Sequence, residues 1–269
     1  MKCDLHIHSV CSDGIYPPQK LVEMAKQKGL DCIALTDHDT VQGVAEARQR
    51  AKELGIKCLV GIELSCYSVC EVHMLGYNMD TSDPGFAREI DSIVQLRNRR
   101  NELIRQKLSQ HGVELDVSKL NRHGTVGRGV MAREMVRLGY CKDIAEVFEK
   151  YLGVDKCCYV QSQRLTPVEG IQLVLRYGGI PVLAHPKKLR LGDINFEQFV
   201  KPLVLAGLGG IEADYFAHNN AERRYYGKIA RKYRLVITGG SDFHDYTHGT
   251  DLGKKSFSPS SYTRTILGI

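Results

Sequence analysis

The sequence predicts an α/β protein with a largely parallel sheet and one helical insertion near the middle of the chain. Short apolar runs alternate with amphipathic helical stretches at both ends of the 269 residues. Strands that alternate with helices form parallel sheets, which are either open or closed into a barrel. From residue 85 to about residue 156 helical periodicity replaces this alternation, which indicates the insertion.

The first half of the chain contains four expected strands, which are CDLHIH, CIALTD, KCLVGIELSC and VHMLGYNM. Between the first two lies a helix over PPQKLVEMAKQKGL, with prolines in its first turn and Gly29 at its end. A second helix, VQGVAEARQRAKELG, ends at Gly55. We expect the fourth strand to run antiparallel to its neighbour.

The second half begins with the helical insertion. After Asp83 and Pro84 the expected helices are QLRNRRNELIRQKL, MAREMVRLG and IAEVFEKYLG. Alternation resumes with a helix over TPVEGIQLVLRYGG, the strands IPVLAH, IEADY and LVITGGSD, a helix from Ala221, and a C-terminal tail. We therefore expect one domain made of residues 1–83 and 157–269, and an inserted, mainly helical domain of residues 84–156.

Composition excludes several classes of protein. The net charge of +6 is compatible with an anionic substrate but is far from the concentrated basic surface of a dedicated nucleic-acid binder. The nine cysteines include no C-x-x-C pair, which argues against a zinc ribbon or finger. Without a visible secretory signal or a membrane-spanning apolar run, we expect a cytoplasmic protein with reduced thiols.

Polar side chains recur where the expected strands end. Because parallel strands bring their carboxyl ends to one edge, these side chains should meet there. In H-x-H the two imidazoles point to the same side of the first strand. A lone histidine is more often a packed or surface residue, but the recurrence over six segments favours a metal site for Zn, Mn or Fe. The residues concerned are His6, His8, Asp37, His38, Glu63, His73, His185, Glu212, Asp242 and His244.

The ordered set of motifs H-x-H, T-D-H-D, G-I-E, H-x-L-G-Y, A-H-P and G-S-D-F-H resembles the PHP (polymerase and histidinol phosphatase) superfamily of metal-dependent phosphoesterases. The resemblance implies a distorted (β/α)7 barrel that holds three divalent metal ions at its C-terminal rim. It also implies that the inserted helical domain covers the active site. The metals would be Mn, Fe or Zn, because the ligand set does not distinguish among them.

Carried over residue by residue, the resemblance implies three groups of ligands. The first metal would be held by His6, His8, Glu63 and Asp242. Glu63 would bridge to a second metal, completed by His73 and His185. The third would be held by Asp13, His38 and His244.

Three further carboxylates are placed around these ligands. We expect Asp37, Asp39 and Glu212 to orient imidazoles through their distal N–H groups. Helix capping for Asp39 and a surface position for Glu212 are equally open alternatives. Cys11 and Cys66 lie near ligands in the sequence, but we expect them to be small buried residues.

The stretch TVGRGVMAREMV is similar to the G-R-x-x-x-A-R segment of a PHP subgroup with an inserted helical domain. In that subgroup an arginine of the insertion reaches the substrate, which implies Arg128 first and Arg133 second as phosphate ligands. A solvent-facing Arg133 is a competing possibility. The commoner form R-P-H is absent, because Gly129 and Val130 follow Arg128. His218 resembles a rim position that contacts phosphate or base.

The basic run RNRRNELIRQKL is most simply a solvated helix face. It would contact a nucleic acid or other ligand only if Arg97, Arg100 and Arg105 faced the cleft.

The subgroup resemblance implies an enzyme that hydrolyses phosphate esters of small nucleotides with a hydroxide bridging two metals. It would release the 3′-phosphate of a 3′,5′-nucleoside bisphosphate or trim short RNA from its 5′ end, leaving a nucleoside 5′-monophosphate. The alternatives are a phosphoesterase for histidinol phosphate or cyclic ribose phosphates, and an amidohydrolase-like zinc hydrolase. A non-catalytic metal- or nucleotide-binding module is the alternative of another class. The sequence gives no indication of the oligomeric state.

Overall fold

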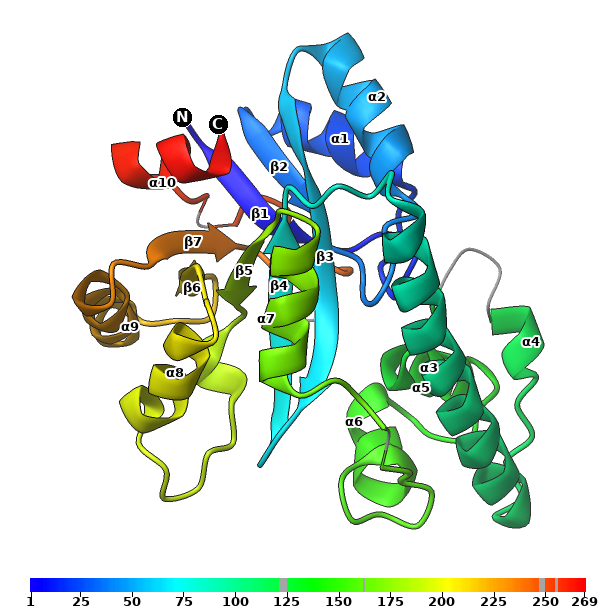
Figure 1. The fold of residues 1–269 in the computed structure, drawn as a ribbon. Helices are drawn as coiled ribbons and strands as arrows, with labels where there is room; N and C mark the ends of the chain where they lie inside the picture. Colours follow the sequence, from blue (N-terminus) through cyan, green and yellow to red (C-terminus); the bar gives the residue numbers. More distant parts are fainter. Residues whose placement is uncertain (121–124, 162, 247–249, 255) are drawn as a thin grey trace.

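The computed structural model describes residues 1–120, 125–161, 163–246, 250–254 and 256–269. In this part of the chain one sheet curves into a nearly closed barrel surrounded by helices (Figure 1). The strands follow one another around the sheet in chain order. They are β1 (Cys3–Ile7), β2 (Cys32–Leu35), β3 (Lys57–Tyr67), β4 (Glu71–Tyr77), β5 (Ile180–Leu183), β6 (Gly210–Tyr215) and β7 (Val236–Gly240).

The strands are parallel except around β4. The pairs β1–β2, β2–β3, β5–β6 and β6–β7 are parallel, whereas β4 is antiparallel to both β3 and β5. The barrel closes where Ile7 bridges Phe243 and where the His8 N–H donates to the Phe243 carbonyl over 2.9 Å. The structure confirms the implied seven-stranded barrel and the antiparallel fourth strand.

Helices follow most strands and cover the outside of the barrel. They are α1 (Pro18–Gln27), α2 (Val44–Leu54), α7 (Pro167–Arg176), the short 3-10 helix η2 (Pro186–Lys188), α8 (Phe196–Leu205), α9 (Asn220–Lys232) and α10 (Ser261–Leu267). The second helix begins three residues later than we predicted, with Gly43 at its N-terminus and packed closely against Leu35 and Pro18. The expected C-terminal tail is partly helical, and the Ser260 side chain caps α10.

The predicted helical stretch lies to one side of the barrel (Figure 1). The first turns of α3 pack on the barrel through Phe86 and Ile90. The rest of this stretch has an apolar cluster of its own, which includes Ile104, Met131 and Leu152. Its elements are α3 (Pro84–Gln110), α4 (Val117–Leu120), α5 (Arg128–Arg137), α6 (Ile144–Val147) and a π-helical turn, η1 (Phe148–Leu152).

In the described residues none of the helices combines the length and the apolar character that crossing a membrane requires.

Candidate metal centre

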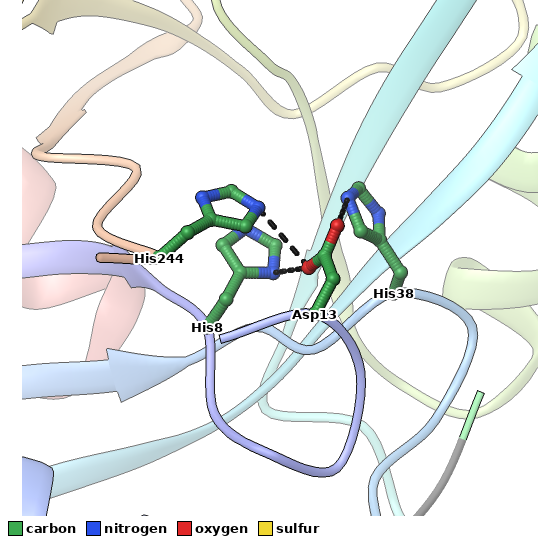
Figure 2. Close-up of side chains that lie close together, drawn as sticks. All are labelled: His8, Asp13, His38 and His244. Carbon is green, nitrogen blue, oxygen red and sulfur yellow. Dashed lines mark ion pairs between the residues drawn. The ribbon is translucent and has the colours of Figure 1, made fainter. Parts of the chain in front are cut away.

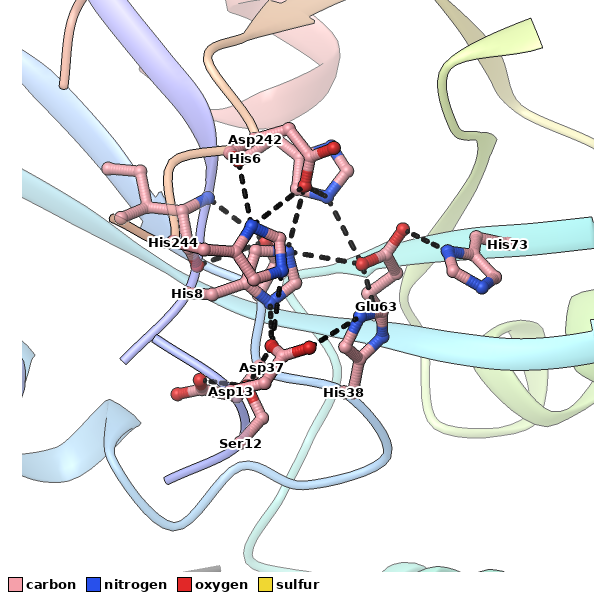
Figure 3. Close-up of polar contacts among 12 residues, drawn as sticks. His6, His8, Ser12, Asp13, Asp37, His38, Glu63, His73, Asp242 and His244 are labelled. Carbon is pink, nitrogen blue, oxygen red and sulfur yellow. Dashed lines mark hydrogen bonds and ion pairs between the residues drawn. The ribbon is translucent and has the colours of Figure 1, made fainter. Parts of the chain in front are cut away.

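The structure brings all of the predicted metal ligands together at one rim of the barrel. Figure 3 labels each of them except His185. Most strands carry a predicted ligand at or just after the end that faces this rim, which is why these side chains meet. His6 lies on β1 and His73 on β4, while His185 follows β5 and Asp242 follows β7. Glu63 lies within the long strand β3, beside the end of β2.

Glu63 is the centre of the cluster. Its carboxylate is fully buried and lies within hydrogen-bonding distance of five imidazole nitrogens. Oε1 lies 2.8 Å from His73 Nδ1 and 3.0 Å from His185 Nε2. Oε2 lies 3.2 Å from His6 Nε2, 3.1 Å from His8 Nε2 and 3.2 Å from His38 Nδ1. One carboxylate thus joins two separate sets of imidazoles.

The first set is completed by Asp242. Its Oδ1 lies 3.4 Å from His6 Nε2 and 3.2 Å from His8 Nε2. With Glu63 Oε2, these atoms form a compact, buried group of two nitrogens and two oxygens. This is the donor set that Zn, Mn and Fe prefer.

A second group gathers around Asp13 (Figure 2). Asp13 Oδ1 lies 3.1 Å from His244 Nε2 and 3.8 Å from His8 Nδ1, and Oδ2 lies 3.8 Å from His38 Nε2. The rings of His8 and His244 stack with their centroids 4.0 Å apart. His8 therefore presents one ring nitrogen to each group, a sharing that the residue-by-residue expectation did not include.

The electrostatics of the centre fit bound cations. In the described part of the chain, His6 Nε2, both ring nitrogens of His8 and Glu63 Oε2 are buried without a hydrogen bond. Burial lowers the pKa of His8, but Asp242, Glu63 and Asp13 outweigh it and raise the pKa to about 10. Burial also opposes ionisation of Glu63, yet the surrounding imidazoles hold its pKa well below the usual range. The cluster attracts positive charge, and its unsatisfied lone pairs suit divalent metals.

Burial has the opposite outcome for two of the imidazoles. It lowers the pKa of His38 to about 3 and that of His185 to about 3, because like charges nearby add to the loss of solvation. These two rings are neutral at ordinary pH, which is the state in which imidazole binds metal.

Glu212 orients an imidazole, as we predicted. Its Oε1 lies 3.0 Å from His6 Nδ1, and its Oε2 accepts the His185 N–H over 2.7 Å. The carboxylate is completely buried, so the alternative of a surface position is wrong. A carboxylate on the distal nitrogen fixes the ring and directs Nε2 toward the cluster.

Asp37 and Asp39 take other partners than imidazoles. Asp37 accepts hydrogen bonds from the Ser9 N–H (2.7 Å), the Ser9 hydroxyl and the Ser12 hydroxyl (both 2.6 Å), and so holds the loop that carries Asp13. Asp39 accepts the Ser65 N–H over 2.8 Å and pairs with Arg97 of α3. It caps no helix, because Gly43 occupies the N-terminus of α2.

Sequence reasoning missed three residues that fix Asp242. Buried Asp4 accepts the Ser241 N–H (2.9 Å) and the Ser241 hydroxyl (2.6 Å) next to it. The Tyr215 hydroxyl and the Lys188 ammonium lie 3.0 Å and 2.5 Å from Asp242 Oδ2. The alternation D-x-H-x-H at the start of the chain was a usable signal for Asp4, because all three side chains share one face of β1.

The backbone at this rim is strained where the ligands need it. His185 and Asp242 have φ angles of 23° and 51°, in the left-handed region that non-glycine residues rarely adopt. At Gly240 a Cβ would lie 2.4 Å from the His6 Cβ, so only glycine lets β7 pass this close to His6.

A cavity of about 140 Å³ adjoins the ligands Asp13, His38 and His73. Arg128 lines it, as predicted for a phosphate ligand, and its Nη2 lies 2.8 Å from Glu71 Oε2. Its guanidinium also lies over the Tyr159 ring, 5.5 Å from the centroid.

The other arginines that the sequence suggested as ligand contacts differ in where their side chains lie. Arg97 and Arg100 line this cavity, whereas Arg105 faces outward and pairs with Glu102, so the expectation of a uniformly solvated face is wrong for the first two. Arg133 donates to the Asp13 carbonyl, so it is not simply directed to solvent.

His218 lies behind the rim. It is buried, and its Nδ1 lies 2.9 Å from the Ala213 carbonyl oxygen. Its ring packs against Tyr215 and Tyr226, with centroid distances of 5.2 and 4.8 Å. It is not among the residues that line the cavity, and these contacts favour a packing role over the predicted contact with substrate.

The barrel and its rim of imidazoles and carboxylates define an α/β-barrel protein with several groups of side chains able to hold metal ions. Residues 4–157 match the family model described as the PHP domain. The chain is 31% identical to a 5′-3′ exoribonuclease of Haemophilus influenzae (94% of this chain, 93% of the relative). It is 31% identical to a 3′,5′-nucleoside bisphosphate phosphatase of Chromobacterium violaceum (93% and 92%). It is 30% identical to a phosphoribosyl 1,2-cyclic phosphate 1,2-diphosphodiesterase of Eggerthella lenta (90% and 93%).

Among solved structures, a metal-dependent phosphoesterase from Bifidobacterium adolescentis superimposes with a TM-score of 0.89 at 29% identity, over 99% of this chain and 95% of the other. The chain belongs to the PHP domain family and is a metal-dependent phosphoesterase. It is an enzyme, so the alternative of a non-catalytic binding module is wrong.

Replacing Asp242 with asparagine should reduce bound metal and hydrolytic rate together, because an amide removes the negative charge that faces His6 and His8. Metal content by inductively coupled plasma spectrometry and rate on one phosphoester are the two measurements. Asp80→Asn is the matched control, since Asp80 is exposed and its side chain bonds only Ser82 in the described residues. Full metal content in Asp242→Asn would show that Asp242 is not a ligand.

The metal-free protein should lose stability as the pH rises from about 6.5 to about 10. Folding raises the pKa of His8 to about 10 and that of His73 to about 9. The stability that these two protonated rings contribute is complete below the pKa of the unfolded chain, and it is lost as the pH rises through the pKa of the folded protein. We expect its melting temperature to fall by roughly 5 °C or more over this range. Metal binding needs neutral imidazoles, so the stabilisation by added Mn²⁺ should grow over the same range. A metal-free melting temperature that rises with pH would contradict this account.

Proposed function

We propose that the enzyme acts on small nucleotides, releasing the 3′-phosphate of a 3′,5′-nucleoside bisphosphate or trimming short RNA from its 5′ end. Either reaction leaves a nucleoside 5′-monophosphate. The single observation that carries this proposal is the cavity lined by arginines directly beside the ligands His38 and His73. Guanidinium groups bind phosphate oxygens in pairs, so this cavity suits a substrate with more phosphate than one scissile group. The names of the relatives from Haemophilus influenzae and Chromobacterium violaceum support the same substrates.

We further propose that three divalent ions occupy the centre, with Mn, Fe or Zn as the metals. His6, His8, Glu63 and Asp242 would hold one ion, and Glu63 would share a second with His73 and His185. Asp13, His38 and His244 would hold the third, with His8 also in reach. When bound, such ions supply positive charge for phosphate oxygens and lower the pKa of coordinated water.

The chain's own residues would hold the cations and bind the rest of the substrate. The carboxylates of Asp13, Glu63 and Asp242 would share these cations with the surrounding imidazoles, and the bound cations would attract the phosphate. Arg128 reaches the cavity from α5 and would bind a phosphate oxygen in place of Glu71. We propose that residues 84–156 form the domain that covers the site and supplies this arginine.

A cyclic ribose phosphate is the second candidate substrate. The relative from Eggerthella lenta, which is named for that activity, supports it. Histidinol phosphate remains an alternative with no comparable support among the relatives described above.

The proposal is tested by incubating Mn-loaded protein with a panel of esters and measuring released phosphate or product. The panel contains 3′-phosphoadenosine 5′-phosphate, 5′-phosphorylated short RNA, ribose 1,2-cyclic phosphate 5-phosphate and histidinol phosphate. We expect kcat/KM for the bisphosphate or the RNA to exceed that for the other two by at least about tenfold, because only the former leave a 5′-nucleotide in the arginine-lined cavity. A preference for the cyclic ester or for histidinol phosphate would overturn the assignment.

Replacing Arg128 with alanine should raise KM for phosphorylated nucleotides by about tenfold to a hundredfold, since a bidentate charged contact is lost. Metal content should stay at the wild-type level, because Arg128 contacts Glu71 and no metal ligand in the described residues. Steady-state kinetics and metal analysis check both. Unchanged kinetics would remove Arg128 from the substrate site.

A further inference from the structure

Guanidinium groups of four arginines line the cavity beside the metal centre. Arg97 and Arg100 come from α3, Arg128 from α5, and Arg164 from the segment before α7. Arg97 and Arg100 are nearly buried, with 7% and 4% of their surface exposed. Such a concentration of buried positive charge requires a compensating negative charge.

The protein supplies only part of that negative charge. Arg97 pairs with Asp39. Arg128 and Arg164 share the one carboxylate of Glu71, at 2.8 and 2.6 Å. The four guanidinium groups therefore pair with two carboxylates in the described residues, because the third carboxylate at the cavity, that of Asp13, faces imidazoles instead.

Arg100 is the guanidinium without a carboxylate. In the part of the chain that the structure describes, its Nε and Nη2 lie 3.2 and 2.7 Å from the neutral side-chain oxygen of Asn101. Burial and the nearby charges of Arg97, Arg164 and Arg128 lower its pKa to about 9. By contrast, half-buried Arg105 on the same helix pairs fully with Glu102, at 2.9 and 2.7 Å. An unneutralised cation at the wall of a cavity is unfavourable by itself and becomes favourable when an anion binds.

We propose that Arg100, together with Arg97 and Arg164, forms a second anion subsite that holds the non-scissile phosphate of a doubly phosphorylated nucleotide. This inference rests on the proposed function, in which the scissile phosphate lies at the metal centre. The cavity runs from the ligands His38 and His73 to Arg100, so one substrate can contact both. Arg100 is thus a specificity-determining residue, which favours substrates with two phosphates over substrates with one.

Glu71 acts within the same subsite. Its carboxylate neutralises Arg128 and Arg164 and is 40% exposed on the side chain, so it occupies the position of an anion that substrate can displace. Removing its charge frees two guanidinium groups for phosphate. Glu71→Gln should therefore bind nucleotide 5′-phosphate more tightly than the wild type.

The first test measures binding of adenosine 5′-monophosphate to the metal-free full-length protein by isothermal titration calorimetry. Without metals the rim lacks the cations that would bind the scissile phosphate, so the arginine subsite dominates the signal. We expect Arg100→Gln to weaken binding by about 10- to 100-fold and Glu71→Gln to strengthen it several-fold. Arg105→Gln is the matched control and should bind like the wild type.

The second test compares kcat/KM of Mn-loaded enzyme for 3′-phosphoadenosine 5′-phosphate with that for adenosine 3′-monophosphate. Arg100→Gln should lower this ratio by at least about tenfold while leaving the monophosphate value within a factor of about three. Wild-type failure on both esters would overturn the proposed function, and the binding measurement would still decide the subsite.

Two results would overturn the subsite itself. One is equal adenosine 5′-monophosphate affinity in Arg100→Gln and wild type, including the case in which neither binds. The other is an unchanged selectivity ratio. If Arg100→Gln does not fold, Glu71→Gln decides the question, because unchanged or weaker nucleotide binding in that variant contradicts the proposal.

Discussion

The structure depends on one buried carboxylate. Glu63 lies within 3.2 Å of five imidazole nitrogens contributed by four strands or the loops that follow them. Two carboxylate oxygens cannot satisfy five imidazole nitrogens, and five charged rings would repel one another. In the described residues His8 Nδ1 and His185 Nδ1 are also buried without a hydrogen bond. Cations placed between the carboxylate and the rings resolve the conflict, because they accept lone pairs from both.

That requirement explains features of the fold that packing alone does not require. Three buried carboxylates hold neighbouring groups in position. Asp4 bonds Ser241, Glu212 bonds His6, and Asp37 bonds the loop that carries Asp13. The backbone accepts left-handed conformations at His185 and Asp242, which are both candidate metal ligands. Strained or costly local structure persists where the surroundings fix it and function uses it.

The sequence predicted the barrel and the meeting of these polar side chains at one rim for a simple reason: strand periodicity fixes which residues share a face and which edge each strand end reaches. It could not predict which ring nitrogen points where, so the sharing of His8 between two groups appeared only in the structure. The prediction that Asp37 and Asp39 bond imidazoles was wrong. A carboxylate after a strand can turn toward serine or arginine as readily as toward imidazole. Lys188 carried no recognisable pattern at all.

The arginines of α3 also show that the sequence does not reveal which way a side chain points, and the structure shows why. Arg100 and Arg105 look alike in the sequence, but at 100° per residue they are about 140° apart around the helix. Two contacts of Arg97 determine which face of α3 turns toward the barrel. They are its ion pair with Asp39 and its 2.8 Å hydrogen bond to the Ser65 hydroxyl. Asp39 follows β2 and Ser65 lies two residues beyond Glu63, so this contact ties the insertion to the strands that carry the metal ligands. The same contact that orients α3 therefore brings its neighbouring guanidinium, Arg100, to the cavity beside the metal centre.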